Sequence, residues 1–294
     1  MRSAFSGRAV GKGRRRNGEP DPRFAPLRFG DQRGLRLREM PASAVRAALE
    51  AARRAGEPGD WILVKSDGRS RVAAGPTERG SVIVKEYAAR GIARALADAF
   101  RGSPARRAWL GGHGLRRRGI AAARPYAFVE RRRFGLPVAS AAVFEDLRSA
   151  APADRCVPSV ASPGQVVDAL AQLATRLHCS GAVHGDLKAS HVFLERRGRR
   201  LEARPIDLEG VRFRPRLGDR ERIRALAELN ASLPDSIADG PRCRAFARCA
   251  AALPFDRGRE AALREVVAVS LRRDHRWTGA GCAIASQVSG GRRR

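Results

Sequence analysis

The stretch His184-Gly185-Asp186-Leu187-Lys188-Ala189-Ser190-His191 decides how the rest of the chain is interpreted. It leads into a short apolar segment, Val192-Phe193-Leu194, and a second apolar segment follows at 201–206. The second segment ends at Asp207, sixteen residues after the last histidine of the stretch. Short apolar runs separated by polar residues are typical of a hairpin. We therefore expect a hairpin flanked by two carboxylates, Asp186 and Asp207.

Upstream, three short apolar segments predict an antiparallel meander. They cover residues 61–64, 71–74 and 81–85, and Asp67-Gly68 provides the first turn. The second half of the chain is mostly helical, beginning with 164–180, whose apolar residues recur with a helical period. The predicted fold class is therefore α+β.

Asp186, Asp207 and Lys85 are the residue types that phosphoryl transfer requires. One carboxylate orients or deprotonates the attacking hydroxyl, another holds magnesium on the phosphates, and a lysine offsets negative charge. A single His-x-Asp is a weak signal, but its combination with a downstream aspartate and a strand lysine is more specific. The pattern predicts a kinase that uses ATP and Mg²⁺.

The distribution of lysine supports this interpretation. Of the 58 basic residues, 54 are arginine and only Lys12, Lys65, Lys85 and Lys188 are lysine. The planar fork of arginine does not replace a compact ammonium at a nucleotide phosphate without a change in geometry. Two of the four lysines thus stand where a kinase requires them.

Several segments resemble the lipopolysaccharide kinases, relatives of the protein kinases that phosphorylate Kdo or heptose sugars of the inner core. The similarity extends over about residues 60–280 and rests on these segments: 82–87, 103–109 with 118–120, 184–188 with His191, 206–210 and 229–233. It implies a two-lobed, protein-kinase-like fold. Its N-lobe would contain a small antiparallel sheet and its C-lobe would be mainly helical.

The resemblance also implies roles for individual residues. Lys85 would hold the α- and β-phosphates, and Asp186 would be the catalytic base. Lys188 would steady the transferring phosphoryl group, while Asp207 and His191 would bind magnesium. We expect turnover to depend on all five side chains.

The remaining expected nucleotide contacts are Asp67, Gly68 and Glu145. The first two lie in the turn 66–70, and Glu145 lies in an expected hinge at 143–147. This turn lacks the three-glycine loop with which protein kinases cover ATP phosphates, so fewer backbone amides would cradle the phosphates.

A second departure concerns the helix glutamate that pairs with the strand lysine in kinases. From residue 90 to 118 the only acidic residue is Asp98. Either Asp98 pairs with Lys85, or Lys85 is oriented differently. An alternative hypothesis follows, namely a catalytically weak or silent kinase-like module that binds an anionic membrane or nucleic acid.

Composition divides the chain into four predicted parts. Residues 1–40 are expected to be a disordered basic arm, 41–146 the N-lobe, 147–285 the C-lobe with the catalytic loop, and 286–294 a disordered basic tail. The chain shows neither a secretory signal nor a membrane-spanning segment. A cytoplasmic monomer is expected.

Charge and loop length indicate the acceptor. Only about a dozen residues separate Asp207 from the helix expected near Arg220, too few for a long activation segment. A small or lipid-linked hydroxyl acceptor is therefore favoured over a protein. The net charge of +28 would draw the chain to the anionic lipid A core and to the inner-membrane surface, where it would be peripheral.

Other acceptors and partners are less well supported. Aromatic residues make up 5% of the chain and form no stacking platform, which disfavours nucleic acid. A small-molecule kinase of the aminoglycoside phosphotransferase type has a similar His-Gly-Asp loop and remains an alternative, but it would need an acidic acceptor pocket. Arg242, Arg244 and Arg248 either line an acceptor site or form a solvated helical face.

Overall fold

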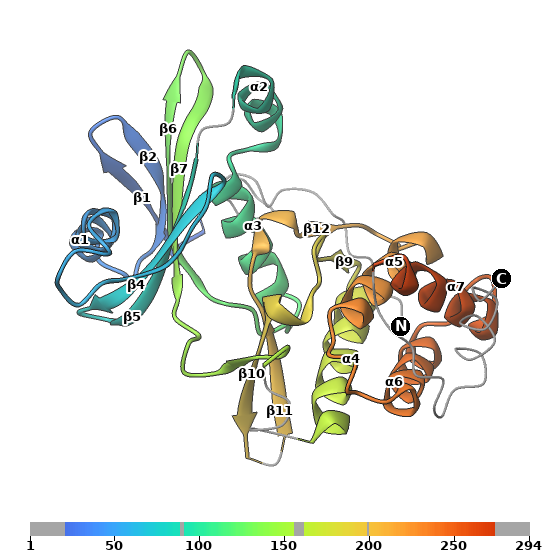
Figure 1. Cartoon of the computed structure of the whole chain (residues 1–294). Helices are drawn as coiled ribbons and strands as arrows, with labels where there is room; N and C mark the ends of the chain where they lie inside the picture. Colours follow the sequence, from blue (N-terminus) through green and yellow to red (C-terminus); the bar gives the residue numbers. More distant parts are fainter. Residues whose placement is uncertain (1–20, 89–90, 156–161, 199, 274–294) are drawn as a thin grey trace. The chain divides into compact units, whose positions relative to one another are not determined.

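The computed structural model describes residues 21–88, 91–155, 162–198 and 200–273 (Figure 1). They form two compact units. The sheet unit contains residues 21–114 and 123–147, and the helical unit contains residues 115–122 and 148–273. Within the described ranges, no helix has the length and apolar character needed to cross a bilayer. The expected tail 286–294 and the first twenty residues of the expected arm lie outside the described residues.

The sheet unit is built on seven antiparallel strands in the order β1-β2-β6-β7-β5-β4-β3. Their bounds are β1 Phe24–Phe29, β2 Gln32–Leu37, β3 Ile62–Ser66, β4 Ser70–Thr77, β5 Gly80–Tyr87, β6 Pro125–Arg133 and β7 Leu136–Glu145. Alternation along β5 buries Val82 and Val84 on one face and places Lys85 on the other. The meander predicted between residues 61 and 85 is present as β3, β4 and β5.

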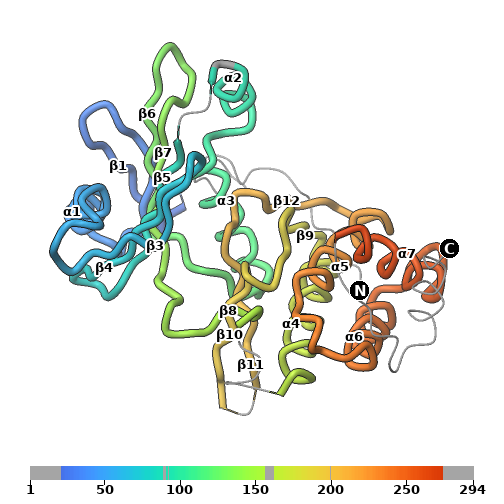
Figure 2. Tube along the Cα trace, in the orientation of Figure 1, coloured from blue at the N-terminus to red at the C-terminus, as the bar shows by residue number. Residues whose placement is uncertain are grey.

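Helix α1 (Ala42–Arg53) covers the face of the sheet that contains Val82 and Val84 (Figure 2). Its buried residues, Val45 and Leu49 among them, recur with the period of a helix and join the core of this unit. Arg71 of β4 donates hydrogen bonds to carbonyl groups at the end of α1, including that of Ala55 at 2.5 Å. The arginine thereby satisfies acceptors that a helix end leaves without partners.

The expectation of a disordered arm is wrong for residues 21–40, because this segment forms β1 and β2. Phe24, Leu27, Leu37 and Met40 are all buried. The many arginines of the segment suggested disorder, but Arg28 and Arg33 are exposed and Arg36 is half-buried within strands that bury several apolar side chains.

Helices α2 (Gly91–Arg101) and α3 (Pro104–Arg116) follow β5. Helix α2 packs against β7. Trp109 of α3 forms an aromatic cluster with three residues, its ring centroid lying 5.1 Å from Phe24, 4.3 Å from His113 and 5.6 Å from Phe128. This cluster ties α3 to β1 and β6.

The helical unit is organised around helix α4 (Pro163–Cys179), which begins with a capping box formed by Ser162 and Gln165. The other helices are α5 Asp219–Ala231, α6 Asp239–Ala252 and α7 Arg259–Leu271. Helix α4 packs against α6, and α5 against α7. Two small antiparallel sheets complete the unit: β8 (Ala151–Pro152) with β10 (Val192–Arg197) and β11 (Arg200–Pro205), and β9 (Ala182–Val183) with β12 (Arg212–Phe213).

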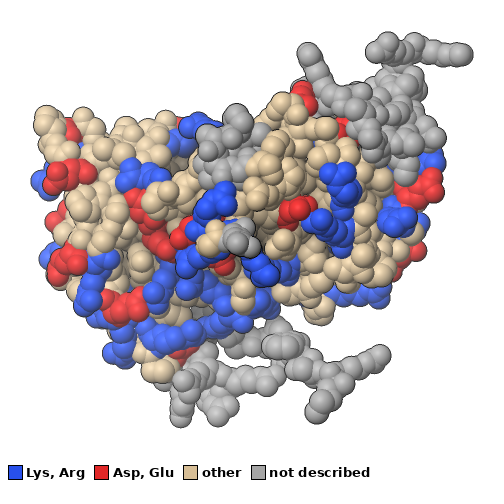
Figure 3. Space-filling view, turned by 90° about the horizontal axis from the view of Figure 1, so that it is seen from below, with Lys and Arg blue, Asp and Glu red and all other residues tan. Residues whose placement is uncertain are grey.

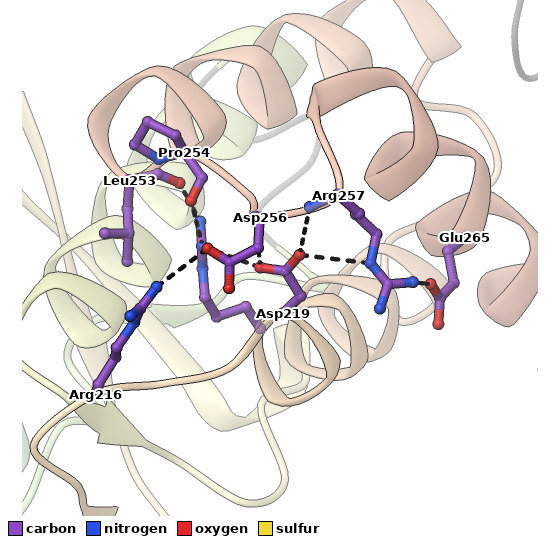
Figure 4. A network of polar contacts seen from close by, with 8 residues as sticks. Arg216, Asp219, Leu253, Pro254, Asp256, Arg257 and Glu265 are labelled. Atoms are coloured by element: carbon purple, nitrogen blue, oxygen red, sulfur yellow. Dashed lines mark hydrogen bonds and ion pairs between the residues drawn. The ribbon is translucent and has the colours of Figure 1, made fainter.

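A polar network fixes the start of α5 to the connection between α6 and α7 (Figure 4). Asp219 accepts hydrogen bonds from the backbone N–H groups of Asp256 (3.2 Å) and Arg257 (3.1 Å). Buried Arg222 donates to the carbonyl of Pro254 at 2.9 Å. Because these contacts anchor α5 at its first turn, its far end offers a fixed support for the loop that precedes β10.

Candidate active site

The loop between β9 and β10 meets the segment after β11 through two glycines. A Cβ atom on Gly185 would lie 2.7 Å from the carbonyl oxygen of Gly210, and one on Gly210 would lie 2.8 Å from the carbonyl oxygen of His184. Gly185 has φ +87°, and Asp207 has φ 62°, a left-handed conformation. Only glycine permits so close an approach of two backbones. This contact brings the carboxylate of Asp186 close to that of Asp207.

The side chain of His184 also joins the β9–β10 loop to the segment after β11. Its Nε2 forms a 2.7 Å hydrogen bond with the carbonyl oxygen of Ile206, the residue before Asp207. The ring is 2% exposed. Burial lowers the pKa of His184, so that the ring stays neutral, and its role is to join the loop to the end of β11.

Three candidate metal ligands converge at this junction. One donor atom from each of Asp186, His191 and Asp207 lies within 4.8 Å of the other two. His191 Nε2 lies 3.7 Å from an Asp207 carboxylate oxygen, and His191 Nδ1 lies 3.0 Å from the backbone oxygen of Asp186. A carbonyl oxygen can only accept, so Nδ1 donates, and Nε2, which faces Asp207, is the nitrogen that carries the lone pair whenever the ring is neutral. A neutral imidazole with this tautomer and a carboxylate could hold a divalent cation between them.

Lys188 is the fourth member of the cluster, with Nζ 2.8 Å from Oδ1 of Asp186. Partial burial raises the pKa of Asp186, but the hydrogen bond and charge of Lys188 and the neighbouring His191 together lower it. The carboxylate is therefore ionised at neutral pH. A group with a lowered pKa is a weak base, suited to orient a hydroxyl and to accept its proton late.

Two residues of the α5 end support this loop, and sequence reasoning did not identify either. Ser232 Oγ accepts a hydrogen bond from the backbone N–H of Ala189 at 2.7 Å and donates to the carbonyl of Leu229 at 2.7 Å. Glu228, buried beside Asp186, pairs with Arg273 at 2.9 Å. A carboxylate on the buried face of a predicted helix was the available signal for Glu228.

Arg242 has a structural role, which corrects the two interpretations considered for it. The side chain is 5% exposed and donates to the carbonyls of Asn230 (2.9 Å), Pro234 (2.6 Å) and Ile237 (2.9 Å). Burial lowers its pKa to about 10, which leaves it charged at neutral pH. Arg242 thus fixes the turn after α5, just beyond Ser232.

The sheet unit contains the expected nucleotide contacts. Lys85 lies on β5, with Nζ 5.1 Å from the centroid of the Tyr87 ring. Glu145 ends β7, and its Oε2 accepts a hydrogen bond from the backbone N–H of Arg124 at 3.2 Å. Asp98 is buried and pairs with Arg107 at 2.7 Å, so this carboxylate is directed to α3 and not to Lys85.

Asp67 and Gly68 form the β3–β4 turn. Oδ1 of Asp67 accepts hydrogen bonds from the backbone N–H groups of Arg69 and Ser70, both at 2.8 Å, and the carboxylate pairs with Lys65 at 2.9 Å. The hydrogen bond with Lys65 and those with the two backbone groups strongly lower the pKa of Asp67. The side chain folds back on its own turn and orders it.

Comparison with known proteins gives a family and a fold. A family model described as the lipopolysaccharide kinase (Kdo/WaaP) family matches residues 85–244, more than half of the chain. No curated protein sequence matches. Among solved structures, WaaP in complex with acyl carrier protein is similar with a TM-score of 0.51 and 19% identity, covering 77% of this chain and 92% of that chain.

Two further solved structures are similar. One is the Rio2 kinase–ADP/Mg²⁺-phosphoaspartate complex from Chaetomium thermophilum, with a TM-score of 0.45 and 16% identity over 86% of this chain and 82% of that chain. The other is the aminoglycoside-3'-phosphotransferase of type VIII, with a TM-score of 0.49 and 17% identity over 81% of this chain and 99% of that chain. The predicted α+β, protein-kinase-like fold class is confirmed.

Proposed function

Because the chain belongs to the lipopolysaccharide kinase (Kdo/WaaP) family and is thus a phosphotransferase with a hydroxyl acceptor, we propose that it transfers phosphate from ATP to a sugar of the lipopolysaccharide inner core. The proposed acceptor is a hydroxyl of Kdo or heptose. The observation that carries the proposal is the convergence of Asp186, Lys188, His191 and Asp207 at one junction.

In the proposed mechanism, Asp186 orients the acceptor hydroxyl and accepts its proton. Lys188 keeps this carboxylate ionised and offsets charge on the transferring phosphoryl group. Phosphoryl transfer proceeds through a loose transition state in which the protein contributes mainly position and electrostatics. A base of lowered pKa is adequate for that purpose, because the hydroxyl proton is transferred late.

The carboxylate oxygens of Asp207 and Asp186 are compatible with magnesium, and Nε2 of His191 would be an additional and less usual nitrogen donor. We propose that Asp207 and His191 hold the ion, which would neutralise charge on the nucleotide phosphates. In the sheet unit, Lys85 is the proposed phosphate contact, with Asp67, Gly68 and Glu145 as further nucleotide contacts.

Charge supports an anionic, lipid-linked acceptor. The chain has a net charge of +28, and Figure 3 shows Lys and Arg side chains gathered on the face seen from below, with acidic side chains among them. Such a surface attracts phosphorylated core sugars and anionic lipid headgroups. It is unsuited to cationic aminoglycosides, and we therefore rank that acceptor class second. Because the similar WaaP structure contains acyl carrier protein, a carrier protein is also a candidate partner.

Mass spectrometry of lipopolysaccharide tests the proposal. Lipopolysaccharide purified from cells that lack the protein should have one phosphate fewer on a core sugar. The parent gene should restore the phosphate, whereas a gene encoding Asp207→Ala should not. An unchanged phosphate content in the deletion strain would overturn the assignment and favour the catalytically silent module.

A further inference from the structure

The β6–β7 hairpin ends in a two-residue turn with an unusual residue. Arg133 pairs with Leu136 across the turn, and the two central residues, Phe134 and Gly135, have φ values of 49° and 77°. Turns with positive φ at both positions favour Asn, Asp or Gly, because a left-handed backbone brings Cβ close to the next carbonyl oxygen. The Phe134 side chain is 102% exposed, so no packing compensates for the strained backbone. Uncompensated strain of this kind points to a function.

A second exposed aromatic side chain lies on α2. Phe100 is 91% exposed and Leu96, one turn earlier on the same side of the helix, is 47% exposed. The opposite side of α2 is fixed, because buried Asp98 pairs with Arg107 of α3. Helix α2 packs against β7, and Figure 1 shows it beside the end of the β6–β7 hairpin, within the same unit.

Arginines accompany these apolar side chains. Arg101 and Arg133 are exposed and form no ion pair with a described residue. Arg132 donates to the carbonyl of Gly135 at 2.9 Å and to Glu130 at 2.7 Å, which holds the turn in shape. The end of the β6–β7 hairpin therefore exposes the aromatic side chain of Phe134 on a turn that hydrogen bonds hold in shape, with the positive charge of Arg133 next to it.

We propose that Leu96, Phe100 and Phe134, with Arg101 and Arg133, form a membrane-docking tip that inserts into the surface of an anionic phospholipid bilayer. Exposed aromatic side chains beside arginines suit the boundary between headgroups and acyl chains. A stable protein partner would need about 800 Å² of contiguous surface, and side chains on two separate protrusions do not offer it. The choice of a bilayer also rests on the proposed function, since a lipid-linked acceptor lies in one.

Vesicle sedimentation of the full chain tests the proposal. The parent protein should bind vesicles of phosphatidylcholine mixed with phosphatidylglycerol, bind phosphatidylcholine alone far less, and lose affinity as salt increases. Phe134→Asn should lower the affinity by about tenfold and leave the melting temperature unchanged or higher, since Asn tolerates a left-handed backbone. Phe100→Ser should weaken binding to a similar extent. Phenylalanine variants that bind like the parent would overturn the proposal.

Charge-matched variants separate docking by the tip from general attraction. Arg101→Ser with Arg133→Ser should weaken vesicle binding. Arg196→Ser with Arg200→Ser, which removes the same charge from the β10–β11 hairpin, should not, because that hairpin has no exposed large apolar side chain. Equal losses from the two pairs would show that net charge alone binds the membrane and would overturn the proposal.

Two further measurements distinguish a membrane site from a protein site, and a failure of this proposal from a failure of the proposed function. If Phe134→Asn loses binding to purified acyl carrier protein while it keeps vesicle binding, the tip is a protein site and the proposal is wrong. Turnover on a water-soluble, deacylated core oligosaccharide should be the same for the parent and Phe134→Asn, because the tip would contact lipid only. A parent protein without turnover would contradict the proposed function and leave the vesicle result standing.

Discussion

The loop 184–191 of the helical unit and the β3–β4 turn of the sheet unit are held in place in different ways. The loop is fixed by contacts with distant residues: Gly185 against Gly210, His184 to Ile206, and Ala189 to Ser232. The turn is fixed by one of its own side chains, Asp67. The difference implies that substitutions far along the chain can disturb this loop, whereas the turn depends mainly on its own residues, with one further backbone hydrogen bond from the N–H of Ala88 to the carbonyl of Arg69.

The largest expected effect separates chemistry in the helical unit from nucleotide binding. Asp186→Asn should lower turnover by about 10²–10⁴-fold, because the amide cannot accept the hydroxyl proton. ATP affinity measured by titration calorimetry should stay close to that of the parent. As the matched change in the turn, Asp67→Asn should affect turnover far less, since an Asn oxygen accepts the same two backbone hydrogen bonds. Undiminished phosphorylation by Asp186→Asn would show that another residue orients the acceptor.

The second-largest effect is expected from a substitution that separates the backbones of Gly185 and Gly210. Gly185→Ala combines a positive φ with a Cβ 2.7 Å from a carbonyl oxygen and should cost about 3–4 kcal/mol in the free energy of unfolding. Gly198→Ala is the control, because Gly198 also has a positive φ but nothing within 4 Å, and it should cost about 1 kcal/mol. Denaturant titration of both proteins measures the difference. Equal costs would mean that the backbone contact contributes nothing.

Mild acid should weaken the helical unit before the sheet unit. Burial, and then the charge of Arg222, lowers the pKa of His178 on α4 to about 4. Between pH 6.5 and 4 this histidine is protonated in the unfolded chain but stays neutral in the folded chain. The free energy of unfolding therefore decreases as the pH is lowered through this range, by up to about 3 kcal/mol. Hydrogen exchange should then rise in α4 peptides before α1 peptides, and His178→Gln should reduce the effect. Simultaneous opening of both helices would contradict the prediction.

The smallest effect is expected from a substitution of Asp98, the acidic residue considered as a partner for Lys85. Asp98→Asn should cost about 1 kcal/mol of stability through its weakened bond with Arg107, and it should leave turnover nearly unchanged. A thermal melt and a steady-state assay are sufficient. A loss of turnover of about tenfold or more would instead indicate that Asp98 pairs with Lys85, as a helix glutamate pairs with the strand lysine in other kinases.

The parts of the molecule that were predictable from sequence are those with local signals. Short apolar segments and a turn predicted β3 to β5, and helical periodicity predicted α4. The rarity of lysine singled out Lys85 and Lys188. Their roles, with those of Asp186, His191 and Asp207, stay predictions until variants are measured.

The remainder depends on contacts that no local pattern encodes. Ser232 supports Ala189 across 43 positions of sequence, and the reason for Gly185 is visible only once Gly210 lies against it. Strands β1 and β2 were missed because the arginines between their apolar residues resemble the composition of a disordered arm.

The buried arginines have a consequence for how this protein can evolve. The buried side chains of Arg222 and Arg242 each donate to two or more backbone carbonyls, and a lysine ammonium could not reach the same set from one position. At an exposed site, exchange between arginine and lysine is reversible at little cost. At these two sites a change to lysine would leave some of these carbonyls without their donor, so the fold that surrounds each arginine makes that exchange costly.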